Sequence, residues 1–252
     1  MSDSSAASFP ENANRLLSQL PASAPYTAAE YYSALLGRAI AASRDGDFGI
    51  GAALVVRYPD IELIVLARNT LISQRDPLGH AEANAIRQLR DFLRLDASAR
   101  ARNVLPWTGP VSAAEGSGNI FVRPAAPDSA ASPSGESVLY ATLEPCPLCT
   151  VAILNSRIEN VIIATPDDLG GALGPRHLEK MPEIIPRMIA SQGMSVKFTS
   201  TDKDGDPGTY IPELLSALLE RAFWDTKEAR DAELAAGVLF DPGMHAILKD
   251  LL

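Results

Sequence analysis

The sequence has little of what marks a disulfide-rich, membrane or nucleic-acid-binding protein. Its 252 residues include only two cysteines, and acidic side chains outnumber basic ones. Cys146 and Cys149 are too close in sequence to staple a fold of this size. This excludes a disulfide framework and indicates metal or redox chemistry in a reducing compartment.

The charge balance disfavours polynucleotide partners. With 22 Lys and Arg against 31 Asp and Glu, the formal net charge is −9, so the mean field of the protein repels phosphate backbones. A small-molecule substrate is favoured over nucleic acid. Residues 1–10 contain no Lys or Arg, and no apolar run follows that could serve as a signal peptide or span a bilayer. We therefore expect a cytoplasmic protein without membrane contacts.

The composition indicates a folded domain with extensions, because hydrophobic residues make up 46% and charged residues 21% of the chain. We divide it into an N-terminal tail (1–27), a core (28–175) and a C-terminal helix-strand-helix extension (176–252). Within the core, residues 96–137 are rich in Ala, Ser, Gly and Pro, which predicts an exposed inserted loop. The apolar stretch Asn119–Arg123 is a possible extra strand, and we expect deletion of 113–134 to leave the fold intact.

Hydrophobic periodicity predicts alternating helices and strands. The helices are expected over 28–43, 77–95, 146–156, 180–192 and 211–234, and the strands over 50–57, 62–67, 138–143, 160–165 and 194–199. The strand-helix-strand run from 138 to 165 is long enough for a right-handed parallel crossover. These elements predict an α/β fold with helices on both faces of a sheet.

Two short motifs point to a metal site. His80-Ala81-Glu82 lies near the start of one predicted helix, and a Pro-Cys-Pro-Leu-Cys sequence containing Cys146 and Cys149 begins another, directly after a strand. In this order the motifs match the two-part signature of zinc deaminases. The chain resembles the cytidine and nucleobase deaminase superfamily over roughly residues 31–165, closest to the branch containing tRNA-adenosine, guanine and cytosine deaminases.

The chemistry of these residues agrees with the resemblance. Cysteines three positions apart at a helix start lie on one face, and the exposed N–H groups there favour the thiolates. One imidazole completes a set of three ligands. Structural zinc normally takes four protein ligands, whereas three leave a position for water, so His80, Cys146 and Cys149 with Glu82 predict a catalytic site.

The resemblance implies a cytidine-deaminase-like three-layer α/β/α sandwich with a five-stranded mixed sheet. It also implies a hydrolytic deaminase with Zn²⁺ as cofactor, which converts an amino-substituted purine or pyrimidine base or nucleoside to the oxo compound and releases ammonia. Glu82 is expected to move protons between water, the ring and the departing ammonia.

Five further positions are candidate substrate contacts. Asn69 ends a predicted strand where similar deaminases place an asparagine that binds the base or ribose, although an asparagine there is also a common turn cap. Phe48 precedes the first strand and is a possible pocket wall, and Ala81 lies between the motif residues. Asp167 and Asp168 follow a strand after which guanine and cytosine deaminases use acidic residues, and solvated loop acids are the alternative.

Other interpretations stay open at this stage. The runner-up is a nucleic-acid editing deaminase of the tRNA-adenosine type. The cysteines alone also fit a redox pair, and the chain also fits an inactive zinc subunit, against which Glu82 argues. Arg87, Arg90 and Arg94 share one helical face, which we interpret as a solvated surface.

Two histidines and two aromatic residues lie outside the motifs. His177 and His245 lack the spacing of zinc ligands, so we expect neither to complete a structural site. Phe223 and Trp224 lie in an apolar C-terminal helix, which predicts core or dimer packing rather than stacking on a base. A homodimer is expected because similar deaminases are commonly oligomers.

Overall fold

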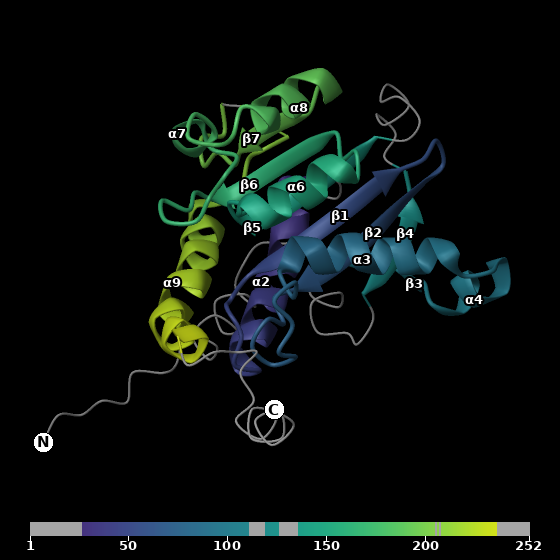
Figure 1. The fold of residues 1–252 in the computed structure, drawn as a ribbon. Coiled ribbons are helices and arrows are strands. Elements are labelled where there is room, and N and C mark those ends of the chain that lie inside the picture. The colour runs from purple at the N-terminus through teal and green to yellow at the C-terminus, as the bar shows by residue number, and fades with distance from the viewer. Residues whose placement is uncertain (1–26, 111–118, 126–135, 205, 207, 236–252) are drawn as a thin grey trace, which may run out of the picture.

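A computed structural model describes residues 27–110, 119–125, 136–204, 206 and 208–235. These residues form three layers, with a mixed β-sheet between helices on its two faces (Figure 1). The predicted α/β sandwich is therefore confirmed. None of the described helices is long and apolar enough to cross a membrane. Most of the expected tail (1–27) and His245 lie outside the described residues.

The central sheet has seven strands in the order β3-β4-β2-β1-β5-β6-β7. The strands are β1 Gly51–Arg57, β2 Ile61–Arg68, β3 Leu105–Pro106, β4 Ile120–Pro124, β5 Ser137–Leu143, β6 Asn160–Thr165 and β7 Ser195–Phe198. The expected number of five was wrong because the predicted insertion supplies β3 and β4. These two strands extend the sheet beyond β2, which would otherwise present an unpaired edge.

Strand directions follow the connections between them. The tight turn after β1 makes it antiparallel to β2, and β1 is also antiparallel to β5. β5, β6 and β7 run parallel to one another. Helix α6 (Pro147–Asn155) connects β5 to β6, so the predicted parallel crossover is confirmed. The carboxyl ends of β5 and β6 therefore lie side by side at one edge of the sheet.

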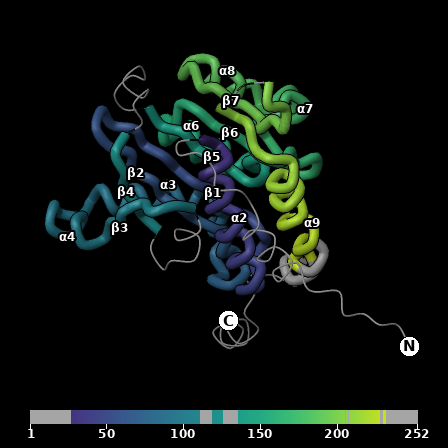
Figure 2. The backbone as a smooth tube through the Cα atoms, turned by 180° about the vertical axis from the view of Figure 1, so that it is seen from behind, coloured from purple at the N-terminus to yellow at the C-terminus, as the bar shows by residue number. Residues whose placement is uncertain are grey.

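The helices divide between the two faces of the sheet. α2 (Ala28–Arg44) and α9 (Glu213–Ala235) pack on one face and on each other. Both helices are seen in Figure 2, which views the molecule from behind relative to Figure 1. The other helices are α3 Ala81–Arg94, α4 Ala97–Arg102, α7 Pro175–Leu178 and α8 Ile184–Gln192, of which α3 packs on β1, β2 and α6. Gly193 ends α8 in the left-handed conformation (φ 64°), which a glycine adopts without steric cost.

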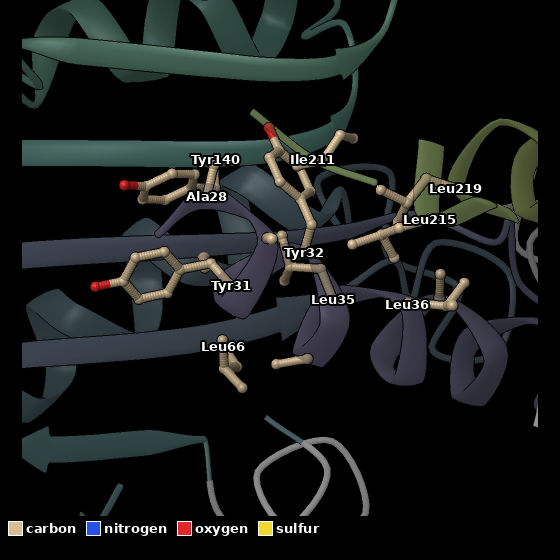
Figure 3. Packing of buried hydrophobic residues seen from close by; sticks show 14 of the residues in the cluster. Ala28, Tyr31, Tyr32, Leu35, Leu36, Leu66, Tyr140, Ile211, Leu215 and Leu219 are labelled. Atoms are coloured by element: carbon tan, nitrogen blue, oxygen red, sulfur yellow. The ribbon is translucent and has the colours of Figure 1, made fainter. Parts of the chain in front are cut away.

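Aromatic and aliphatic side chains fill the core beneath α2 (Figure 3). Tyr31 stacks on Tyr140 with ring centroids 4.5 Å apart, and the hydroxyl of Tyr32 donates to the Ile162 carbonyl at 2.7 Å. Leu215 and Leu219 of α9 are buried in the same cluster. This apolar face of α9 is thus part of the core of its own chain rather than a free surface for a second subunit.

A buried ion cluster ties β4 to the core. Arg123 of β4 is 6% exposed and bonds to Glu30 of α2 at 2.6 Å and to Glu62 of β2 at 2.8 Å. Removing one partner from such a group leaves a buried charge without compensation. The possible extra strand over Asn119–Arg123 is therefore present as β4, and this part of the insertion 96–137 belongs to the sheet rather than to an exposed loop.

Candidate active site

Two helix starts bring together the side chains of both sequence motifs. His80 is the N-cap of α3, Cys146 is the N-cap of α6, and Cys149 lies in the first turn of α6. The candidate ligand atoms of these three residues all lie within 4.8 Å of one another. The three residues meet because α3 and α6 contact each other on one face of the sheet, and because residues three positions apart at a helix start lie on the same side of the helix.

The turn before α3 explains why the helix begins at Ala81 and not at the expected Pro77. The Asp76 carboxylate accepts a hydrogen bond from the Leu78 amide at 2.9 Å, and the Asp76 carbonyl accepts one from Gly79 at 2.8 Å. These bonds close a turn over 76–79. His80 consequently takes the extended N-cap conformation, and Glu82 falls in the first helical turn.

The donor set fits a zinc ion. The Sγ atom of Cys146 lies 3.6 Å from Nδ1 of His80. Ligand atoms about 2.0–2.3 Å from a tetrahedral zinc are roughly 3.5 Å apart, so little rearrangement is required. Hydrogen bonds from Cys149 and His80 lower the pKa of Cys146 to about 4, while the bond with Cys146 and burial raise the pKa of Cys149. A bound cation would favour both thiolates.

Glu82 lies against this cluster in a dry environment. Its side chain is 4% exposed, and its Oε2 atom lies 3.5 Å from Cys149 Sγ. Burial raises the pKa of Glu82 above the ordinary value of a carboxyl. A raised pKa makes a carboxyl a better proton acceptor, which suits general acid–base chemistry.

A cavity of about 330 Å³ opens beside these residues. Its volume lies within the range of small-molecule sites, and its walls combine apolar side chains with a few polar groups. Phe48 and Phe223 line it with ring centroids 6.2 Å apart and planes inclined by 31°. The lining also includes Asn69, His80, Glu82, Cys146 and Asp167. A flat ring bound there would have the two phenylalanine rings on one side and the polar side chains of the lining near its edge.

Asn69 caps a turn and also lines the cavity. It is 1% exposed and directly follows β2. Its amide oxygen accepts a hydrogen bond from the Leu71 amide at 3.1 Å, as expected of a turn cap. The next turn is held by Asp47, whose buried carboxylate accepts from the amides of Ile72 and Ser73 at 2.8 and 2.9 Å. The sequence motifs do not single out Asp47, so this contact was not predicted.

The two acidic residues after β6 differ sharply in environment. Asp167 is 7% exposed and lines the cavity, and its Oδ1 atom accepts from the amides of Leu169 and Gly170 at 3.0 Å each. The side chain of Asp168 is 71% exposed, pairs with Arg176 at 3.5 Å and is not part of the lining. The structure therefore brings Asp167 to the cavity and leaves Asp168 outside it.

Glu144, which the sequence motifs do not single out, organises the loop that contains Asp167. Its carboxylate accepts hydrogen bonds from the amides of Asp167, Leu173 and Gly174 at 3.2, 3.0 and 2.7 Å. It also pairs with His177 Nδ1 at 3.0 Å, which leaves His177 apart from the metal cluster, as expected. A Cβ atom at Gly171 would lie 2.4 Å from the Glu144 carboxyl carbon, so the loop closes over Glu144 only with glycine there.

The predictions for Ala81 and Phe223 have different outcomes. The Ala81 side chain is fully buried between α3 and the sheet and does not line the cavity. Phe223 packs in the core, as predicted, but it also forms a cavity wall, which sequence reasoning missed. Lys227 and Asp231, one and two helical turns further along α9, line the cavity and form an ion pair with each other. No local motif marks these positions.

The sequence matches the family described as the cytidine and deoxycytidylate deaminase zinc-binding region over residues 27–165. It is 26% identical over 144 residues to a tRNA-specific adenosine deaminase of Bacillus subtilis, covering 57% of this chain and 65% of that protein. It is 50% identical over 40 residues to the protein of that name from Haemophilus influenzae, covering 16% of this chain and 23% of that one. The chain therefore matches less than two thirds of the length of either relative.

Solved structures show low sequence identity to the chain. One, from work on A-to-I editing by tRNA:A34 deaminases, is 22% identical with a TM-score of 0.42, and the match covers 67% of this chain and 95% of that one. Another, a guanine deaminase from Nitrosomonas europaea, is 17% identical with a TM-score of 0.41, covering 78% and 86% of the two chains.

The family match includes all three candidate zinc ligands and Glu82, and it extends over more than half of the sequence. Together with the cluster of one histidine and two cysteines, it confirms the prediction of a zinc cofactor. It also decides against an isolated redox pair, because the cysteines belong to a zinc-binding region. The chain is a member of the cytidine and deoxycytidylate deaminase zinc-binding family.

Proposed function

We propose that the protein is a zinc-dependent hydrolytic deaminase that converts an amino-substituted nucleobase or nucleoside to the oxo compound and ammonia. One observation supports this above all: buried Glu82 lies 3.5 Å from Cys149, within a three-ligand cluster that borders a cavity. Three protein ligands leave one position of a tetrahedral zinc for the reaction.

In this proposal His80, Cys146 and Cys149 hold the metal. Bound zinc supplies a Lewis acid that makes water nucleophilic near neutral pH. Glu82 accepts a proton from the attacking water, transfers a proton to a ring nitrogen and later delivers one to the leaving amino group. The water oxygen bonds to the amino-bearing carbon, the C–N bond breaks, and ammonia leaves.

The cavity walls suggest how the ring is held. Phe48 and Phe223, which pack against each other, would together contact one face of it, since aromatic side chains stack on planar bases. Asn69 and Asp167 would bond to its polar edge, where Asp167 accepts from N–H groups. Asp168 and the side chain of Ala81 are omitted because neither lines the cavity.

A free base or nucleoside is the preferred substrate. The cavity of about 330 Å³ matches a small molecule, and the net charge of −9 disfavours a polyanion. The second candidate is a nucleic-acid editing deaminase, favoured by the similarity to tRNA-specific adenosine deaminases. For the first candidate we expect tRNA and single-stranded DNA to bind only with the non-specific Kd of about 10⁻⁴–10⁻⁶ M at physiological salt.

Ammonia release tests the proposal directly. The zinc-loaded protein is incubated with adenine, guanine, cytosine, their nucleosides, aminated pteridines and triazines, and an unmodified tRNA. Release from a base or nucleoside supports the proposal, whereas release only from tRNA supports the editing enzyme. Zinc-loaded protein that releases ammonia from none of these compounds favours a non-catalytic zinc subunit.

Location and assembly are further parts of the proposal. Two free cysteines with a thiol-rich site suit a reducing compartment such as the cytoplasm. A homodimer is supported by Leu148 and Val151, which are 43% and 40% exposed on α6. Light scattering that gives the mass of one chain would contradict the dimer.

A further inference from the structure

A second and larger cavity lies outside the candidate active site, where the C-terminal end of α2, the end of β2 and helix α3 meet. Its volume is about 670 Å³. The charged side chains that line it are Arg38, Arg44, Arg68, Arg87, Asp45 and Asp91. We call this space the arginine cavity.

The sheet topology explains why this space exists. Strand β4 pairs with β2 only as far as the pair Val65–Ile120, so within the described part of the chain the last residues of β2 extend past β4. Among the described residues, no strand pairs with Ala67 and Arg68 on the β4 side of β2. α2 and α3, on opposite faces of the sheet, flank this stretch and supply the remaining walls.

The charge of the arginine cavity is opposite to that of the protein. Four arginines against two aspartates give a local balance of +2, in a chain with a net charge of −9. Concave sites that concentrate one sign of charge attract ligands of the other sign. This local excess of positive charge favours an anionic ligand.

Two of the arginines are crowded together. Arg38 is only 7% exposed, and both its burial and the neighbouring charge of Arg68 lower its pKa, to about 10. Its Nη1 atom donates to the Asn119 amide oxygen at 3.2 Å, which is a neutral partner. A negative charge placed between Arg38 and Arg68 would offset their mutual repulsion.

The other arginines have donors to offer. Arg68 pairs with Asp45, a bond that occupies one of its five guanidinium N–H groups. Arg44 is exposed at the end of α2 and forms no ion pair within the described residues. Arginine forks bind phosphate oxygens in pairs, with hydrogen bonds that are stronger than those between neutral groups.

We propose that the arginine cavity binds a small phosphate-bearing ligand, either free phosphate or the phosphate of a nucleotide. Its volume accommodates a ligand of nucleotide size. The site is distinct from the candidate zinc site, because the two cavities share no lining residue.

A hydrogen-bond chain links this cavity to the active site. Arg87 Nη2 donates to the Asn84 amide oxygen at 2.9 Å, and Asn84 Nδ2 donates to the Arg68 carbonyl at 2.9 Å and the Thr70 hydroxyl at 3.0 Å. Asn84 thus bonds to the residues on both sides of Asn69, to the backbone of Arg68 and to the side chain of Thr70. A phosphate bound by Arg68 and Arg87 would act on the segment that places Asn69 in the zinc-site cavity.

Calorimetric titration of the full-length, zinc-loaded protein with inorganic phosphate tests the proposal, at constant ionic strength set with chloride. We expect saturable binding of one phosphate per chain. Arg44→Gln and Arg68→Gln should each weaken it about tenfold or more, because a hydrogen bond to a charged group contributes about 1.5 kcal/mol or more. Arg94→Gln, on the exposed part of α3, is the matched control and should bind phosphate normally.

The source of the phosphate is decided by titrating AMP and adenosine in parallel. Tighter binding of AMP than of phosphate, lost in the same variants, identifies a nucleotide, and equal binding identifies phosphate alone. Absence of saturable binding, or binding that Arg44→Gln and Arg68→Gln leave unchanged, overturns the proposal. If a single-stranded oligonucleotide binds 100-fold tighter than AMP through the same arginines, the proposal of a small ligand is overturned. Arg44 is exposed, so its variant stays informative if Arg68→Gln fails to fold.

Discussion

At the scale of single residues, Glu82 allows metal binding to be tested separately from the proposed catalysis. Its carboxyl is buried beside Cys149, whereas the candidate ligand atoms belong to its neighbours. We expect Glu82→Gln to retain zinc and the fold but to lower kcat by about 10²–10⁴-fold, because the amide keeps the shape and cannot transfer protons. Ammonia release, with zinc content measured on the same sample, checks this.

A Glu82→Gln protein with nearly normal turnover would contradict the assigned proton transfer. Glu179→Gln serves as the control, since this exposed side chain lies outside the cavity. Its kcat and zinc content should equal those of the unmodified protein.

Phe223 belongs to the cavity although its helix lies in the C-terminal extension. It packs against Phe48 at a centroid distance of 6.2 Å. We expect Phe223→Leu to raise KM roughly tenfold with a smaller change in kcat, because stacking on a base contributes about 1–3 kcal/mol. Leu214→Ala, at an exposed position of the same helix outside the lining, should leave KM unchanged. Equal KM values for the two variants would show that Phe223 does not contact the substrate.

At the scale of elements, one carboxylate holds the loop between β6 and α7. Glu144 accepts bonds from three backbone amides and one imidazole. Glu144→Gln replaces one accepting oxygen with an NH₂ group, which leaves buried N–H donors unsatisfied. We expect a loss of about 2–3 kcal/mol in the free energy of unfolding, measured by urea denaturation. An unchanged urea midpoint would show that this loop does not depend on Glu144.

The inserted region contains a structural strand. Deleting 113–134 removes β4 and Arg123, and it leaves the buried carboxylates of Glu30 and Glu62 without this partner. We expect destabilisation of at least about 3–5 kcal/mol, or insoluble protein. Deleting 126–134 alone, which spares Ile120–Pro124, is the control and should preserve the thermal midpoint. A stable, folded protein without 113–134 would refute this role of β4.

For the whole molecule, zinc binding and folding should be coupled. The ligands come from α3 and α6, which pack together on one face of the sheet, so the native state binds zinc better than the unfolded chain. We expect about one zinc per chain by metal analysis. With free zinc at about 1,000 times its Kd, chelation should lower Tm by roughly 8–16 °C. If the Tm stays unchanged after complete removal of zinc, folding and zinc binding are not coupled.

Much of this molecule could be predicted from local sequence patterns. The strand over 160–165 is confirmed at both ends, and the helices beginning near Ala28 and Cys146 are confirmed to within one or two residues. Such elements depend on apolar periodicity and on end signals that are read over a few residues. The start of α3 was misplaced because the Asp76 turn, with its side-chain hydrogen bond, competes with the helix.

The sequence by itself determined the α/β class and singled out the candidate zinc ligands and the proposed proton-transfer residue, because motifs and periodicity lie within short stretches of chain. Only the tertiary structure decided that β4 joins the sheet, that Phe223 lines the cavity, and that Asp167 faces it while Asp168 does not. The arginine cavity likewise gathers side chains from α2, β2 and α3. These outcomes depend on contacts between residues far apart in sequence, whose free energies no local pattern encodes.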